Sequence, residues 1–215
     1  MQNKKLIDLN GIRNIIFDLG GVVVNINYNL TLDAFRVLGF YHFDSIYTQL
    51  KQTPLFDLFE TGKISSASFR EEIRKQFPMT DTEFDKAWCA MLLDTPEERI
   101  KLLKKLKEKY RVFLLSNTND IHINYYLPEL NKKYGYDVFS TLFEHTYYSH
   151  EIGLRKPDKE IFEFIVNKES LHVKETLFID DLKANVNGAI QAGLAGYCLE
   201  QGTILDLFPI PVIFD

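Results

Sequence analysis

A short apolar segment that ends in an acid and two glycines constrains the fold more than any other feature of the chain. Residues 15–17 are entirely apolar, Asp18 follows them directly, and Gly20 and Gly21 stand two and three residues further on. An apolar run without alternation is typical of a strand that is buried on both faces, as in a parallel sheet. Residues 111–115, 176–179 and 195–199 have a similar character, so we predict four strands of this kind.

Helical patterns lie between the predicted strands. Thr95 is predicted as the N-cap of one helix and Pro96 as its first residue. Apolar residues at positions 100, 103 and 106 then recur on one face of this helix. Residues 161–166 and 182–192 are also predicted to be helical, and Gly193 ends the second of these segments. Strands that alternate with helices favour an α/β fold with a parallel sheet between layers of helices.

Residues 29–94 interrupt this alternation, because they contain no convincing strand. Four amphipathic segments occupy residues 30–38, 46–59, 66–77 and 82–93, with a helix end at Gly62 and a new N-cap at Ser65 or Ser66. We predict a Rossmann-like core, residues 1–26 and 95–215, and an inserted helical cap, residues 27–94. The aromatic residues predicted to form the core of the cap are Phe35, Phe40, Tyr47, Phe56, Phe59, Phe69, Phe77, Phe84 and Trp88.

Composition excludes several classes of protein. The 215 residues carry 25 Lys and Arg against 30 Asp and Glu, a net charge of −5, which argues against binding to nucleic acid. No apolar run approaches the roughly 18 residues that span a bilayer, and residues 1–10 lack the apolar core of a signal peptide. Cys89 and Cys198 are too few for a disulfide framework, so we expect a cytoplasmic protein without membrane partners.

Polar residues gather where the predicted strands end. Asp18, the pair Ser116-Asn117 and the pair Asp180-Asp181 each follow a predicted strand, and Lys156 precedes a predicted helix. Taken singly, each has a structural interpretation as a turn residue, an N-cap or a solvated charge. The carboxyl ends of parallel strands share one edge of the sheet, where open α/β folds bind ligands. We therefore expect these side chains to lie together, beneath the predicted cap.

This set of groups indicates phosphoryl chemistry. Three neighbouring carboxylates repel one another unless a cation lies among them, and oxygen ligands suit Mg²⁺. Gly20 and Gly21 allow the backbone to approach a phosphate closely. A metal, a lysine, a hydroxyl and backbone N–H groups together form a clamp for a phosphoryl group. Asp18 then has the position of a carboxylate nucleophile.

Four segments, in their order along the chain, resemble the four motifs of the haloacid dehalogenase-like superfamily. These segments are residues 17–24, 115–119, 153–157 and 178–185. The insert resembles the helical cap of subfamily I, so the resemblance covers the whole chain. Within the superfamily the sequence is similar to the bacterial sugar-phosphatase branch that includes α-D-glucose-1-phosphate phosphatases.

The resemblance implies a Mg²⁺-dependent phosphatase that hydrolyses a small phosphorylated metabolite, such as a sugar 1-phosphate, through an aspartyl-phosphate. It implies that Asp18 is the nucleophile and that Lys156 neutralises the phosphoryl group, so loss of Lys156 should lower activity without affecting the fold. The implied phosphate-binding residues are Gly20, Gly21, Ser116, Asn117 and Lys156. The implied metal ligands are Asp18, the Gly20 carbonyl and Asp181, with Asp180 binding directly or through water.

One departure from the family pattern bears on the chemistry. The phosphatases usually carry a second Asp, the general acid and base, at the position of Gly20. Its loss favours substrates whose leaving groups need little protonation, unless another group such as His122 supplies the proton. Two alternatives remain: a metal-independent 2-haloacid dehalogenase-like hydrolase, and a binding or regulatory protein with weakened chemistry. The Asp180-Asp181 pair argues against the former, since without a cation it would repel Asp18.

Overall fold

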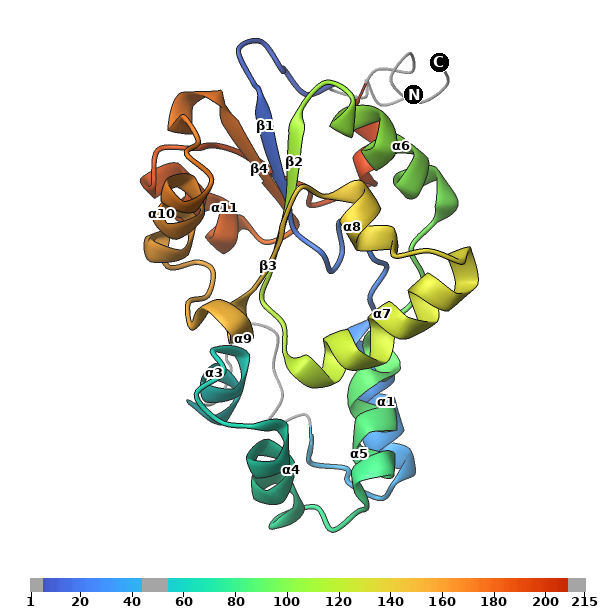
Figure 1. The fold of residues 1–215 in the computed structure, drawn as a ribbon. Helices are drawn as coiled ribbons and strands as arrows, with labels where there is room; N and C mark the ends of the chain where they lie inside the picture. Colours follow the sequence, from blue (N-terminus) through green and yellow to red (C-terminus); the bar gives the residue numbers. More distant parts are fainter. Residues whose placement is uncertain (1–5, 44–53, 209–215) are drawn as a thin grey trace.

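The structure is a computed structural model that describes residues 6–43 and 54–208. Its sheet has five parallel strands in the order β3-β2-β1-β4-β5 (Figure 1). The strands are β1 (Asn14–Phe17), β2 (Arg111–Ser116), β3 (Thr146–Tyr148), β4 (Thr176–Asp180) and β5 (Ala195–Cys198). The predicted Rossmann-like α/β fold is therefore confirmed. The edge strand β3, which has only three residues, was not among the four predicted strands.

Helices cover both faces of the sheet, which explains why residues 15–17 of β1 are all apolar. Ile15 and Phe17 belong to the core on one face, and Ile16 belongs to the core on the other. Residues of α6 (Glu97–Lys107) and α8 (Val138–Leu142) pack into the first core. Residues of α10 (Lys159–Lys168) and α11 (Lys183–Gln191) pack into the second (Figure 1). A parallel sheet needs this double cover to bury its strands.

The start of α6 differs from the prediction by one residue. Pro96 occupies the N-cap position, and Thr95 makes no capping hydrogen bond. The Thr95 side chain lies in a buried site, where its hydroxyl is 2.6 Å from the hydroxyl of Tyr126. A buried hydroxyl needs a hydrogen-bond partner, and the tyrosine supplies it in place of the backbone of the helix.

One long helix, one short helix and two 3₁₀ turns complete the core. Helix α7 (Asp120–Tyr134) follows β2, and α9 (Ser149–Ile152) follows β3. The turn η2 (Val173–Glu175) precedes β4, and the turn η3 (Ile204–Asp206) follows β5. The N-cap of α7 is Asn119, whose side chain accepts a hydrogen bond from the backbone of His122. This cap turns the chain at the carboxyl end of β2. Within the described residues, no helix combines the length and apolar character needed to cross a bilayer.

The described residues of the insert are helical and contain no strand. They form α1 (Tyr28–Val37), α3 (Pro54–Glu60), α4 (Ser66–Arg74), α5 (Asp81–Trp88) and the turn η1 (Cys89–Met91). Ser65 is the N-cap of α4, as predicted, and accepts a hydrogen bond from the backbone of Ser68. The predicted helix over residues 46–59 lies outside the described residues except for its last part, which belongs to α3. These helices lie below the carboxyl ends of the strands (Figure 1).

The insert has an apolar core of its own, built mainly from aromatic rings. Its buried members include Phe35, Phe56, Phe69 and Trp88, and the rings of Phe59 and Phe69 stack with their centroids 4.1 Å apart. Of the aromatic residues predicted for this core, only Tyr47 lies outside the described part of the chain. This cluster is separate from the two that cover the sheet, and Ile121 of α7 also packs into it.

The two segments that join the insert to the core lie side by side. Ile26 and Leu92 form an antiparallel bridge, and the backbones of Asn25, Leu93 and Asp94 continue the pairing with hydrogen bonds of 2.9 Å. We propose that the cap, residues 27–94, meets the core, residues 1–26 and 95–215, at this pair of segments.

Candidate active site

The polar residues predicted from the strand ends meet at the carboxyl edge of the sheet. Asp18, Ser116, Lys156 and Asp181 line one cavity of about 550 Å³ between the sheet and the insert. Asp18 and Ser116 stand at the ends of β1 and β2, Asp181 follows β4, and Lys156 lies in the loop before α10. These groups, which follow or precede separate elements along the chain, therefore lie together in the structure, as predicted.

Lys156 is the centre of the buried charges. Its Nζ lies 2.5 Å from Asp18 Oδ1, 2.7 Å from Asp180 Oδ2 and 3.1 Å from the carbonyl oxygen of Leu115. The side chain of Lys156 is 1% exposed. Burial alone would lower the pKa of this ammonium group, but the two carboxylates raise it to about 12. Lys156 is therefore protonated at neutral pH and is a fixed positive charge rather than a proton donor.

The carboxylates outnumber this one ammonium group. Burial raises the pKa of Asp18, and Asp180 and Asp181 add to the rise, while Lys156 opposes it. Burial likewise raises the pKa of Asp181, to about 6, with Asp180 adding to the effect. Burial and neighbouring like charges both disfavour the ionised carboxylates, and a nearby positive charge favours them. The site therefore favours a bound cation.

The donor atoms fit a hard divalent ion. Asp18, Asp180 and Asp181 each offer a carboxylate oxygen, and these oxygens all lie within 4.8 Å of one another. Oxygen ligands of this kind suit Mg²⁺.

The three acids differ in their other hydrogen-bond partners. Asp180 accepts hydrogen bonds from Lys156, from the side chain of Asn185 and from the backbone of Leu182. Asp180 thus holds Lys156 and the start of α11, whereas Asp181 faces the cavity.

Asn117 uses its side chain to fix the lysine loop. Its Nδ2 donates to the Lys156 carbonyl oxygen over 2.8 Å, and its Oδ1 accepts from the Lys156 backbone N–H over 2.9 Å. Both ends of the amide are therefore engaged with one residue. Asn117 was predicted to contact phosphate, and its amide positions Lys156 in this structure. Phosphate contacts by Ser116 and Asn117 stay predictions.

The two glycines after Asp18 have different conformations. Gly21 has a φ of +80°, and a Cβ there would collide with Asp181 Oδ2, so this position needs glycine. Gly20 has no positive φ, and a Cβ there would meet only the flexible end of Ile26, at 3.1 Å. The backbone conformation at Gly20 therefore permits a side chain, provided that Ile26 shifts by a few tenths of an ångström.

His122 lines the cavity but is poorly suited to donate a proton. Its Nε2 donates to the carbonyl oxygen of Trp88 over 3.2 Å, so Nδ1 carries no hydrogen in the neutral ring and lies 3.3 Å from Asn119 Nδ2. Burial lowers the pKa of His122 to about 4, partly offset by the bond to Trp88. The ring is therefore neutral near pH 7, and its one N–H group is already engaged.

Sequence reasoning did not identify the part of the cavity wall that the insert supplies. Tyr28, Phe56, Asp57, Glu60 and Trp88 line the cavity, as does Arg155 of the core. Phe56 and Trp88 were predicted as members of the cap core, and Tyr28 was not singled out. Asp57 and Glu60 lie in a helix in which each acid follows two apolar residues, a pattern that many surface helices share. One sequence feature could have indicated this part of the cavity wall. Arg155 directly precedes Lys156, so its side chain was bound to lie near the predicted site.

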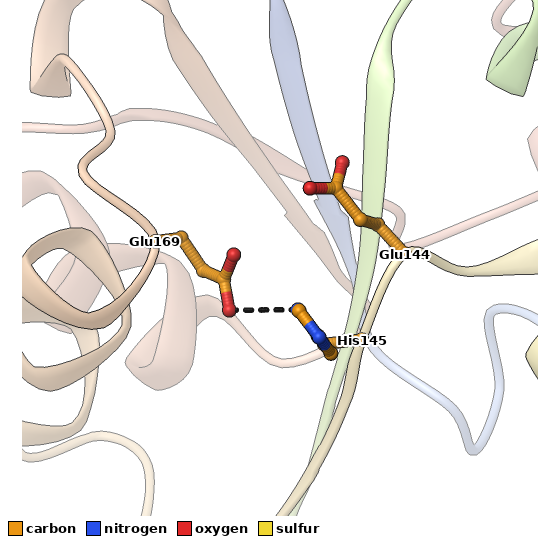
Figure 2. Close-up of side chains that lie close together, drawn as sticks. All are labelled: Glu144, His145 and Glu169. Atoms are coloured by element: carbon orange, nitrogen blue, oxygen red, sulfur yellow. Dashed lines mark ion pairs between the residues drawn. The ribbon is translucent and has the colours of Figure 1, made fainter.

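A second group of acids lies at the opposite edge of the sheet, where β2 and β3 begin. Glu144, His145 and Glu169 lie close together, with His145 Nδ1 2.8 Å from Glu169 Oε1 (Figure 2). Arg111 pairs with both acids, at 2.6 Å from Glu144 and 3.0 Å from Glu169, and the Tyr147 hydroxyl donates to Glu169. The protein itself satisfies these carboxylates, which makes this group a structural network rather than a metal site.

Comparisons with known proteins agree with this geometry. A family model described as haloacid dehalogenase-like hydrolase matches residues 12–193. D-ribitol-5-phosphate phosphatase of Bacteroides thetaiotaomicron is 30% identical over 89% of this chain and 93% of its own length. A sesquiterpene phosphatase of Aspergillus oryzae is 28% identical over 84% of this chain and 86% of its own length.

A solved structure is similar throughout. It is a single-residue mutant of a haloacid dehalogenase (HAD) family enzyme from Bacteroides thetaiotaomicron, in complex with magnesium and inorganic phosphate. The TM-score is 0.81 and the identity 35%, over 86% of this chain and 93% of that one.

Proposed function

Because this chain belongs to the haloacid dehalogenase-like hydrolase family, we propose that it is a Mg²⁺-dependent phosphatase of a small sugar or polyol monophosphate. The observation that carries the proposal is the buried Lys156 ammonium group between Asp18 and Asp180, at the floor of a cavity large enough for such a substrate. A relative solved with magnesium and inorganic phosphate supports the cofactor and the chemistry. A cytoplasmic location stays a prediction.

Asp18 is the proposed nucleophile. Lys156 holds Asp18 Oδ1 from one side, which leaves the other carboxylate oxygen to attack phosphorus. The first step forms a bond from Asp18 to phosphorus and breaks the bond to the substrate oxygen, which leaves as the alcohol after taking a proton from water. In the second step water attacks phosphorus, the bond to Asp18 breaks, and inorganic phosphate is released. Lys156 balances negative charge through both steps.

The proposed metal ligands are Asp18, Asp181 and the carbonyl oxygen of Gly20, with Asp180 in contact through water. Asp180 is given the indirect role because its oxygens already accept hydrogen bonds from Lys156, Asn185 and Leu182. When bound, Mg²⁺ would neutralise charge on the transferring phosphoryl group. Ser116 and the backbone at Gly20 and Gly21 are proposed to complete the phosphate site.

The residue at position 20 sets the proposed leaving-group preference. An acid two residues after the nucleophile is absent, and His122 is neutral with its N–H group engaged. A missing general acid costs about 10²–10⁴-fold in rate when the leaving oxygen is strongly basic. A sugar 1-phosphate leaves as a hemiacetal oxygen, which is less basic than the primary alkoxide left by a 6-phosphate. We therefore propose that 1-phosphates are the better substrates.

The matching experiment compares kcat/KM for α-D-glucose 1-phosphate and D-glucose 6-phosphate, which differ in the leaving oxygen and share the sugar. We expect the 1-phosphate to be favoured by about tenfold or more. The Gly20→Asp variant should narrow this ratio, because the backbone there accepts a side chain and the new acid can protonate an alkoxide. The relative named for D-ribitol 5-phosphate acts on a primary phosphate, so that compound is included. Equal efficiency on both glucose phosphates would mean that another group supplies the proton.

A further inference from the structure

The wall of the cavity that faces away from the sheet carries its own set of charges. Asp57 and Glu60 project from α3, and Arg155 reaches them from the core. Arg155 Nη2 lies 3.0 Å from Glu60 Oε2, and Nη1 pairs with Asp57 Oδ1. The Glu60 side chain is only 16% exposed. These three residues form a polar wall that spans the insert and the core, and we refer to them as the acidic wall.

The net charge of this wall is negative. Two carboxylates face one guanidinium group, and Asp158 adds a further acid to the cavity lining. The other cation at the cavity, Lys156, is already held between Asp18 and Asp180. No lining cation in the described residues is therefore left to balance a second anionic group on a substrate. Juxtaposing like charges in such a site weakens binding.

The same wall suits hydroxyl groups. Carboxylate oxygens accept hydrogen bonds from hydroxyls, and the Nε of Arg155 is buried without a hydrogen-bond partner among the described residues. Tyr28 also lines the cavity, and its pKa is raised by burial first and then by Asp18, so the phenol keeps its proton. Trp88 adds an aromatic surface for C–H groups. A polyhydroxylated carbon chain matches this mixture of groups.

We infer that Glu60 and Arg155 determine specificity by binding the hydroxyls of an uncharged sugar or polyol, and that the acidic wall rejects phosphorylated acids and bisphosphates. This inference rests on the proposed phosphatase function. The two adjacent cations then have distinct roles. Lys156 balances the charge of the phosphoryl group, and Arg155 binds the hydroxyls of the alcohol part of the substrate.

Two substrates that differ in one group test the inference. D-ribitol 5-phosphate carries a hydroxymethyl group at carbon 1, and D-ribonate 5-phosphate carries a carboxylate there. We expect the wild type to favour ribitol 5-phosphate by about tenfold or more in kcat/KM. Glu60→Gln removes one negative charge with little change of shape, and should shift this ratio toward the ribonate by about tenfold, mainly through KM. Efficiency on p-nitrophenyl phosphate, which has no sugar hydroxyls, should fall less than that on ribitol 5-phosphate.

The matched control is Glu72→Gln, an exposed acid of α4 that pairs with Lys75 away from the cavity. Its substrate ratio should equal that of the wild type. If Glu60→Gln folds poorly, Asp57→Asn is the second variant, because Asp57 is half exposed and belongs to the same wall. An unchanged ratio in the folded variant overturns the inference while leaving phosphatase activity standing. If the wild type releases phosphate from none of the three compounds, the proposed function fails first.

Discussion

Replacement of Asp18 by asparagine is expected to reduce kcat/KM for phosphate release by about 10⁴-fold or more, because an amide cannot form the acyl-phosphate bond. The measurement is the initial rate of phosphate release from p-nitrophenyl phosphate with Mg²⁺ present. The substitution should not lower the Tm in the absence of metal. It removes one of three carboxylates that face a single ammonium group, and Lys156 keeps its pairing with Asp180.

The control for this variant is Asp33→Asn, which changes an exposed acid of α1 that pairs with Arg36. That enzyme should retain the activity of the wild type. A folded Asp18→Asn protein with activity within tenfold of the wild type would exclude Asp18 as the nucleophile.

Replacement of Lys156 by methionine is expected to affect both activity and stability. Loss of the ammonium group should lower kcat/KM by about 10²–10³-fold, because the phosphoryl charge loses its fixed counter-ion. It also leaves Asp18 and Asp180 buried without their cation, which should reduce the free energy of unfolding by about 3–5 kcal/mol. Added Mg²⁺ should recover part of the stability, since a ligand that binds only the native state stabilises it.

These effects are measured by phosphate release and by urea denaturation in EDTA and in Mg²⁺. Lys159→Met is the matched control, because Lys159 is an exposed lysine three residues away that pairs with Glu163. The sequence alone suggested that loss of Lys156 would spare the fold. That expectation is revised because the side chain is 1% exposed and bonded to two acids. A Lys156→Met protein as stable as the wild type in EDTA would contradict the account of the buried charges.

The sheet and the reacting groups could be predicted because their signals are local. Residues 15–17 must be buried on both faces, so they are apolar without alternation, and the residue that follows marks the end of the strand. Asp18, Ser116 and Asp180 therefore mark the carboxyl ends of three strands that are far apart in the sequence. The parallel arrangement then brings them together with no further information.

The remaining features depend on contacts between distant segments. The pair of hydrogen bonds between Asn117 and Lys156 joins two loops, and nothing in the sequence of either loop predicts it. The pairing of Arg155 with Glu60 depends on how the insert lies over the core. The prediction of Thr95 as an N-cap was wrong. A threonine before a proline and two glutamates is typical of an N-cap, but the Thr95 hydroxyl forms a hydrogen bond with the buried Tyr126 hydroxyl instead.

The most direct test of the central proposal is metal dependence of phosphate release by the unmodified chain. The protein is treated with EDTA, assayed with p-nitrophenyl phosphate and D-ribitol 5-phosphate, and assayed again as Mg²⁺ is added. Three carboxylates around one lysine predict negligible release in EDTA and saturable recovery with Mg²⁺. Release at the same rate in EDTA and in Mg²⁺, or no release in either, would contradict the proposal.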